Sequence, residues 1–285
     1  MGNVKCCHVE TIENIKQERP CYLQRRMELL SNASLQPVPE LSTDRTTFFL
    51  EEISLWKVHM SVPSRINRIQ KNIERVMELP NNVYILKPTR LKRMTRYRLA
   101  IRMPYGHVDF FDYLMQPLDM EKVHKHLKHM AESILWLHGQ GLAHRDIKPE
   151  NFVLHSYGHF RLIDFDFTDS IHQISICGTK NYAVTPRVVA SWGCKTNMAI
   201  RADVYSFGKL LLFTLQCAAE HGKIRKGLAP LFRDMFLSNF VESEFIHLKE
   251  PAATWFRVAK QCCRGTPPLG IPRLSIVRPH VALVT

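Results

Sequence analysis

The chain has 285 residues, of which 45% are hydrophobic and 23% are charged, so it can bury a sizeable core, and disorder throughout is excluded. Its formal net charge of +13 at pH 7 gives a surface field that attracts anions, which include nucleotide phosphates, nucleic acid, acidic proteins and anionic membranes. No apolar run approaches the ~20 residues that a membrane-spanning helix needs, so an integral membrane protein is not expected.

The eight cysteines lack the paired CxxC spacing and the companion histidines of a zinc site. A reducing environment explains them most simply, so we expect an intracellular, cytoplasmic protein. Gly2 would follow the initiator methionine as a myristoylation site, and Cys6 and Cys7 beside it would accept palmitoyl groups. Two acyl chains would hold the protein at the cytoplasmic face of a membrane, whereas the alternative is an unmodified N-terminus.

The N-terminal part of the chain is expected to form strands after an extension. Residues 1–44 contain loop-like stretches rich in Pro, Ser and Asn, which indicate an extension that acylation would modify. In residues 46–50 and 53–58, β-branched and aromatic side chains then predict a hairpin or successive strands.

A helix and two further strands are expected next. Apolar residues recur at spacings of three and four from Ile66 to Met77, which predicts a helix with one apolar face. Residues 83–86 and 98–101 are candidate strands. Residues 45–103 therefore predict a small β-rich lobe with one helix.

The C-terminal part has a helical pattern. Apolar residues from Val123 to Leu137 line one side of a long helix, and residues 206–218 predict a mostly apolar helix that belongs to a core. We therefore expect an α+β protein, with one domain over residues 45–285 and a larger helical lobe over about 107–285.

The clearest chemical signal lies between residues 144 and 166. The run His144-Arg145-Asp146-Ile147-Lys148-Pro149-Glu150-Asn151 precedes a second motif, Asp164-Phe165-Asp166. In sequence, order and separation, these motifs resemble the catalytic loop and the metal-binding motif of eukaryotic protein kinases. The resemblance implies a two-lobed kinase fold with ATP bound between the lobes.

The chemistry explains why such residues are needed. Transfer of a γ-phosphoryl group to a hydroxyl requires that spreading negative charge be neutralised and that the nucleophile be aimed. Asp146 can accept the hydroxyl proton, and Lys148 can reach the γ-phosphate. Asn151 and Asp164 supply hard oxygen ligands, which suit a Mg²⁺ ion that bridges the phosphates.

The resemblance extends along the C-terminal part. Asp203-Val204-Tyr205-Ser206-Phe207-Gly208 is similar to the segment whose aspartate braces the catalytic loop. Residues 177–182 resemble the substrate-docking end of the activation segment, with Thr179 near the catalytic aspartate, and together with Lys148 this favours serine/threonine specificity. Arg145 could receive a phosphate of the activation loop, for which the candidates are Thr168, Ser170 and Ser175.

In the smaller lobe, Lys57 is similar to the strand lysine that binds the α- and β-phosphates. The resemblance makes Glu74 on the following helix its ion-pair partner, although Glu78 would fit nearly as well. The strand ending at Ile101 and the following segment from Arg102 to Gly106, which includes Met103, resemble the hinge that hydrogen-bonds adenine.

Three departures from the family pattern stand out. No glycine occurs between Gly2 and Gly106, so the glycine-rich loop over the phosphates is missing. Asp166 replaces the glycine of the metal motif, and Thr185-Pro186-Arg187 replaces Ala-Pro-Glu, so that no ion pair to a distant arginine such as Arg273 can form. Such departures are typical of divergent kinases, including compact ones of large DNA viruses, and of pseudokinases.

The sequence therefore favours an active serine/threonine kinase that uses ATP and Mg²⁺ on protein substrates. Its basic surface would suit acidic substrates or an anionic membrane leaflet. A pseudokinase that acts as a scaffold or regulator is the alternative, although the joint presence of the four catalytic-site side chains argues against it. A basic nucleic-acid-binding protein is a third interpretation, but no nucleic-acid motif is present and no specific nucleic acid is expected.

Overall fold

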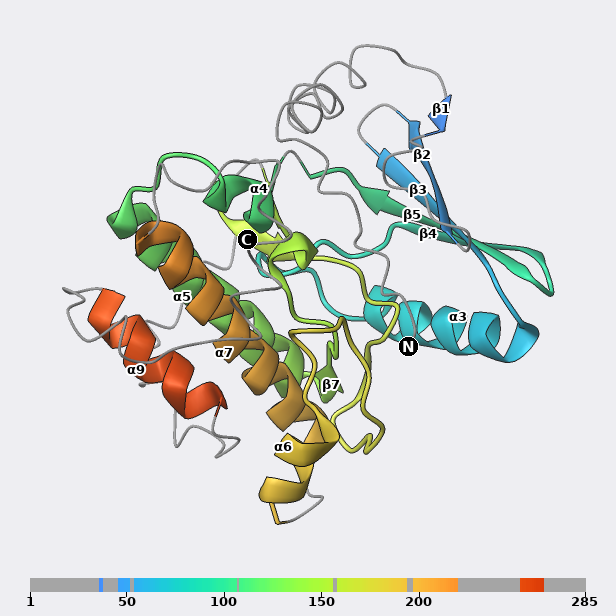
Figure 1. Ribbon diagram of the computed structural model, residues 1–285. Helices are drawn as coiled ribbons and strands as arrows, with labels where there is room; N and C mark the ends of the chain where they lie inside the picture. Colours follow the sequence, from blue (N-terminus) through green and yellow to red (C-terminus); the bar gives the residue numbers. More distant parts are fainter. Residues whose placement is uncertain are drawn as a thin grey trace, which may run out of the picture.

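The computed structural model describes residues 36–37, 46–51, 54–106, 108–155, 158–193, 197–219 and 252–263. It consists of a β-sheet part with one helix and a larger, mainly helical part, as the α+β prediction expected (Figure 1). Gly2, Cys6 and Cys7 lie outside the described residues, and so does Arg273.

The sheet of the N-terminal part is antiparallel throughout and has the strand order β1-β2-β3-β5-β4. Its strands are β1 (Gln36–Pro37), β2 (Thr46–Glu51), β3 (Ser54–Met60), β4 (Arg90–Thr95) and β5 (Arg98–Pro104). The strands predicted at 46–50, 53–58 and 98–101 are confirmed as β2, β3 and β5. Strand β1 lies before residue 45, where the sequence analysis placed the start of the domain, and that boundary stays a prediction.

Helix α3 (Pro63–Met77) confirms the predicted amphipathic helix. Pro63 suits its first turn, where a backbone N–H has no partner within the helix. Its apolar stripe, which includes Ile66 and Ile73, is buried, and the helix contacts β4 and β5. By contrast, the strand predicted at 83–86 is reduced to an isolated bridge between Ile85 and Leu162.

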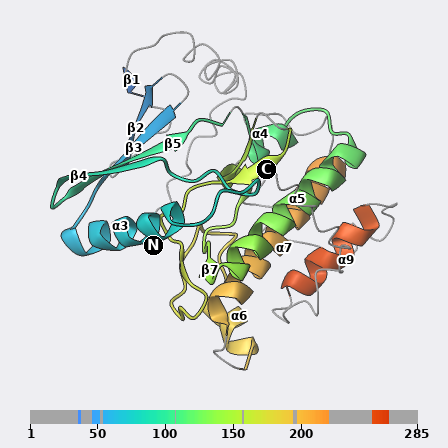
Figure 2. The same cartoon turned by 180° about the vertical axis from the view of Figure 1, so that it is seen from behind.

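The C-terminal part is built mainly from helices. These are α4 (Phe110–Leu114), α5 (Met120–Gly139), α6 (Pro186–Ser191), α7 (Met198–Ala219) and α9 (Ala252–Cys263). Helices α5, α7 and α9 lie side by side in both views (Figure 2). Helix α7 is apolar around most of its circumference because it lies between α5 and α9. Among the described helices, none combines the length and apolarity that a membrane crossing requires.

Short strands position the chemical motifs. They are β6 (Val108–Asp109), β7 (Leu142–Ala143), β8 (Phe152–Leu154), β9 (Phe160–Leu162) and β10 (Asp169–Ser170), with a 3₁₀ turn at Pro149–Asn151. Strands β8 and β9 pair as a hairpin in which Phe152 lies opposite Leu162. Asn151 directly precedes this hairpin and Asp164 follows it, so the ladder brings the two motifs together.

One hydrophobic core joins the two parts. It contains residues of α3, β5, α5, β9 and α7, and its largest fully buried side chains include Phe110, Phe160 and Phe213. Gly208 on α7 allows α9 to approach, because a Cβ atom there would lie 2.7 Å from the Cβ of Cys262. The segment that carries the catalytic motif therefore packs against the buried core formed by the helices.

Candidate active site

The backbone of the catalytic loop is held by one buried carboxylate from α7. Asp203 has no exposed surface; its Oδ2 accepts a hydrogen bond from the His144 N–H at 2.8 Å and its Oδ1 from the Arg145 N–H at 2.6 Å. The Nε2 atom of His138 lies 2.9 Å from the same Oδ2. Arg145 has a φ of 69°, a left-handed conformation that costs energy in a residue with a side chain. Asp203 therefore does what the resemblance implied and stabilises a strained turn next to Asp146.

Asp146, Lys148 and Thr179 form a compact polar group. Asp146 Oδ1 accepts hydrogen bonds from the Thr179 N–H at 2.7 Å and from the Thr179 hydroxyl at 2.8 Å. The Lys148 Nζ atom lies 3.1 Å from Asp146 Oδ2 and donates to the Thr179 hydroxyl at 2.9 Å. Burial alone would raise the pKa of Asp146, but the charge of Lys148 and the hydrogen bond from Thr179 outweigh it and lower that pKa. Asp146 is therefore an ionised acceptor at neutral pH.

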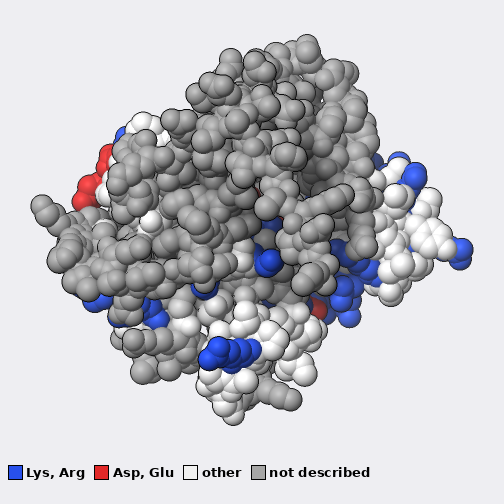
Figure 3. Space-filling view, in the orientation of Figure 1, with Lys and Arg blue, Asp and Glu red and all other residues white. Residues whose placement is uncertain are grey.

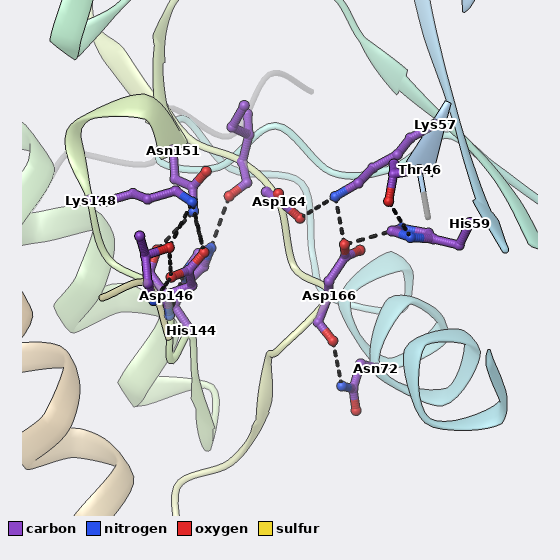
Figure 4. Close-up of polar contacts among 12 residues, drawn as sticks. Thr46, Lys57, His59, Asn72, His144, Asp146, Lys148, Asn151, Asp164 and Asp166 are labelled. Carbon is purple, nitrogen blue, oxygen red and sulfur yellow. Dashed lines mark hydrogen bonds and ion pairs between the residues drawn. The ribbon is translucent and has the colours of Figure 1, made fainter. Parts of the chain in front are cut away.

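Asn151 and Asp164 carry the two side-chain oxygen donors that the sequence predicts for a Mg²⁺ site. The Asn151 Nδ2 atom donates to the backbone oxygen of Asp146 at 2.7 Å, which leaves its side-chain oxygen as the atom suited to a cation (Figure 4). Its backbone oxygen accepts from the Ile163 N–H at 2.9 Å, next to Asp164. The described residues contain no group of three His, Cys, Asp or Glu side chains that could hold a metal on their own. One carboxylate and one amide oxygen nevertheless fit Mg²⁺, which commonly binds few protein oxygens together with substrate phosphates and water.

Lys57 projects from β3 towards the metal motif. Its Nζ atom lies 2.8 Å from Asp164 Oδ1 and 2.5 Å from Asp166 Oδ2, and only 5% of the residue is exposed (Figure 4). Burial alone would lower the pKa of Lys57, but the charges of Asp164 and Asp166 outweigh it and raise that pKa above its ordinary value. The structure thus brings a charged Lys57 next to the predicted metal ligand.

The expected ion pair between Lys57 and Glu74 is not among the ion pairs of the described residues. Glu74 lies on the exposed face of α3, and its Oε1 accepts a hydrogen bond from Gln70 at 2.9 Å. The reason is helical geometry, since Glu74 is one residue, or about 100°, away from the buried Ile73. Glu78, the alternative, is also exposed at the end of the same helix.

Asn72 takes the position on α3 that faces the metal motif. It is 2% exposed, and its Nδ2 donates to the backbone oxygen of Asp166 at 3.0 Å (Figure 4). Asp166 itself supplies a carboxylate to Lys57, where the family resemblance implied one from the helix. Its presence at a position where the family has glycine was the signal that could have identified it.

The two residues predicted for the hinge, Ile101 and Met103, lie in different surroundings on β5. Ile101 is fully buried and lies between Lys57 on β3 and Leu91 on β4, so its side chain is part of the core and its backbone belongs to the sheet. Met103 lies beyond the last β4 pair and is partly buried. Of the two residues, only Met103 retains a backbone edge that β4 does not cover.

Arg145 reaches the segment that the sequence analysis identified as regulatory. Its Nη2 atom donates to the Ser175 backbone oxygen at 2.8 Å and to the Ser175 hydroxyl at 2.5 Å. Ser175 is exposed, whereas Thr168 is fully buried. Ser170 lies in β10. Of the three candidate phosphorylation sites, Ser175 is the one whose hydroxyl contacts Arg145.

The fold and this group of side chains are those of the protein kinase class. The family model described as the protein kinase domain matches residues 63–228, which is more than half of the chain. The chain therefore belongs to the protein kinase family. The matched region begins after Lys57, so the role of Lys57 is supported by its geometry alone.

Several curated protein kinases are similar to part of this chain. An Aurora kinase of Yarrowia lipolytica is 37% identical over 93 residues, which cover 32% of this chain and 24% of that protein. The serine/threonine-protein kinase cds1 of Schizosaccharomyces pombe is 29% identical over 158 residues, which cover 49% of this chain and 34% of that protein. The serine/threonine-protein kinase AtPK1/AtPK6 of Arabidopsis thaliana is 33% identical over 125 residues, which cover 41% and 26%. The matches thus span about a quarter to a third of each relative.

Proposed function

We propose that the protein is an active serine/threonine kinase that transfers the γ-phosphoryl group of ATP to hydroxyl groups of protein substrates. The observation that carries this proposal is the hydrogen bond from the Thr179 hydroxyl to the ionised carboxylate of Asp146. A threonine hydroxyl is the kind of group that such a substrate presents, and Asp146 already accepts a hydrogen bond from one. Lys148, which contacts both residues, places a positive charge where the transferred phosphoryl group carries negative charge.

The nucleotide and the metal ion follow from the remaining residues of the site. Lys57 would bind phosphates of ATP, and Asn151 and Asp164 would bind Mg²⁺, which neutralises phosphate charge when bound. Met103 would contribute to the adenine site through its free strand edge. The names of the relatives, which include several serine/threonine-protein kinases, support this assignment at moderate identity.

The test is transfer of labelled γ-phosphate from Mg·ATP to two generic protein substrates, acidic casein and basic histone. The native chain is compared with Asp146→Asn and with Asp119→Asn as a matched control. Asp119 caps α5 at the surface, where asparagine caps equally well, so this control should retain activity. Transfer that is lost only in Asp146→Asn supports the proposal, and stronger labelling of casein would support acidic substrates.

A pseudokinase is the second candidate, because a specific sequence feature favours it. No glycine occurs between Gly2 and Gly106, so the sequence lacks the glycine-rich loop that the family places over the phosphates. Close approach of backbone N–H groups to phosphates is easiest where no side chain intervenes. Absence of transfer by the native chain, together with absence of Mg·ATP binding, would favour a scaffold or regulatory role.

We also propose that the protein acts in the cytoplasm at an anionic membrane surface. The hairpin of β4 and β5 carries exposed basic residues, and Lys and Arg side chains lie at separate points around its outer end (Figure 3). Exposed Met94 and Tyr97 accompany them. Binding of the full chain to phosphatidylserine vesicles should fall as salt rises and should weaken in Lys92→Glu/Arg96→Glu. Equal binding to neutral vesicles would contradict this proposal.

A further inference from the structure

The ion pairs of Lys57 have an unusual origin. Among the described residues, its ion pairs are to Asp164 and Asp166, which both belong to the metal motif, while the carboxylate of Glu74 lies on the exposed face of α3. Asp164 is also the carboxylate suited to the metal ion. A lysine that depended on Asp164 alone would therefore compete with the metal for the same group. Asp166 gives Lys57 a second carboxylate that the metal does not require.

Asp166 is itself held in place by β3. His59 Nε2 lies 3.1 Å from Asp166 Oδ2, and the Nδ1 atom of His59 lies 3.3 Å from the hydroxyl of Thr46 on β2. Lys57 and His59 are two residues apart on one strand, so their side chains lie on the same face of the sheet. The carboxylate of Asp166 therefore bridges two basic side chains of one face, with 12% of its side chain exposed.

The backbone of residue 166 is fixed by α3. The Asn72 side chain donates to the Asp166 backbone oxygen at 3.0 Å from the buried face of the helix. Helix and lysine are thus connected through Asp166, by an amide hydrogen bond on one side and an ion pair on the other.

We propose that Asp166 is the residue that positions Lys57 for the nucleotide phosphates, in place of a helix glutamate, and that His59 and Asn72 orient Asp166. The inference rests on the proposed kinase function and concerns a positioning residue, because Asp166 acts on the nucleotide through Lys57. It predicts that the chain needs no acidic residue on α3 for catalysis.

The experiment compares Asp166→Asn, Asp166→Glu and Glu74→Gln in the full chain. Asp166→Asn should lower kcat/KM for Mg·ATP by on the order of 100-fold, since a misplaced catalytic group commonly costs that much. The KM for the protein substrate should not change, because Asp166 acts on the nucleotide through Lys57. A general structural defect would instead alter the kinetic constants for both substrates. Asp166→Glu, which keeps the carboxylate, should recover part of the loss. Glu74→Gln, a change at an exposed residue, should stay within about twofold of the native chain.

A second measurement does not require catalysis. The rate at which acetic anhydride modifies Lys57 in the full chain, followed by peptide mass spectrometry, reports whether the ammonium group is held by its carboxylates. The rate should rise in Asp166→Asn and stay native in Glu74→Gln. If the native chain transfers no phosphate, the proposed function fails, while this measurement still decides the position of Lys57.

Two results would overturn the inference. One is a native kcat/KM for Mg·ATP, or an unchanged Lys57 modification rate, in a folded Asp166→Asn variant. The other is a loss in Glu74→Gln comparable to that expected for Asp166→Asn, which would return the positioning role to the helix. The second result decides the question even if Asp166→Asn does not fold, because Glu74 lies at the surface.

Discussion

Replacement of Asp203 by asparagine should destabilise the protein and slow catalysis together. Asp203 is fully buried and serves two backbone N–H groups and His138. Asparagine has nearly the same shape but only one acceptor oxygen, so one buried N–H loses its partner, which costs about 1–3 kcal/mol. The remaining hydrogen bonds also lose the strength that a charged acceptor gives. We therefore expect the free energy of unfolding to fall by about 3 kcal/mol.

The loss of stability is measurable as a thermal shift. For a chain of this size, a loss of that magnitude corresponds to a drop in Tm of roughly 6–12 °C. Circular dichroism can measure this drop. At a temperature where the variant is still folded, kcat should fall by on the order of 100-fold, because the strained turn at Arg145 no longer holds Asp146 in place. Asp119→Asn is the matched control. A Tm within about 1 °C of native and a kcat within about twofold would refute the bracing argument.

Three further changes test other parts of the structure. Thr179→Ala removes the hydroxyl that contacts Asp146 and should lower kcat by roughly 10-fold, whereas Thr179→Ser should retain most of the native rate; equal rates would contradict this. Burial and neighbouring histidines lower the pKa of His126 to about 4, so its contribution to stability is full above the unfolded value of 6.5 and is lost as pH falls towards 4. Urea unfolding across that range should show a weaker pH dependence in His126→Phe, and an unchanged dependence would assign it to other groups. Gly208→Ala should cost about 1–3 kcal/mol in a thermal melt, because its Cβ would lie 2.7 Å from Cys262 Cβ, and an unchanged Tm would show that α9 can shift at no cost.

The catalytic loop was predictable because its chemistry is local in sequence. Asp146, Lys148 and Asn151 lie within six consecutive residues, so their spacing alone indicates a joint role. Helices α3 and α5 were predictable for a similar reason, since each repeats its apolar residues over several turns and tertiary packing has little freedom to override such a pattern.

Two strand assignments depended on information that a local pattern does not carry. Strand β4 was missed because its residues are largely exposed and basic, and its identity comes from pairing with β5. Residues 83–86 have the β-branched and aromatic composition of a strand, but only Ile85 forms a bridge, to Leu162. The neighbouring strand of a hairpin decided the first case, and a residue far along the chain decided the second.

The partner of Lys57 could not be predicted for a related reason. The contact joins residues 57 and 166, which lie 109 positions apart. Which carboxylate reaches the lysine depends on the rotation of α3, and one residue of rotation separates an inward side chain such as Ile73 from the outward Glu74. A family resemblance supplies the expected partner, but only the packed structure shows that Asn72 faces the site.

In the hairpin of β8 and β9, the distance between the two proposed metal ligands does not depend on the length of the loop between the strands. Asn151 and Asp164 flank the paired ends of the hairpin, where Phe152 lies opposite Leu162, while the turn near Gly158 lies at the opposite end. Extra residues inserted at that turn would lengthen the loop without moving either ligand, because the ladder sets their separation. The turn is therefore a place where a fluorescent reporter could be attached to the kinase with its phosphotransfer site left intact.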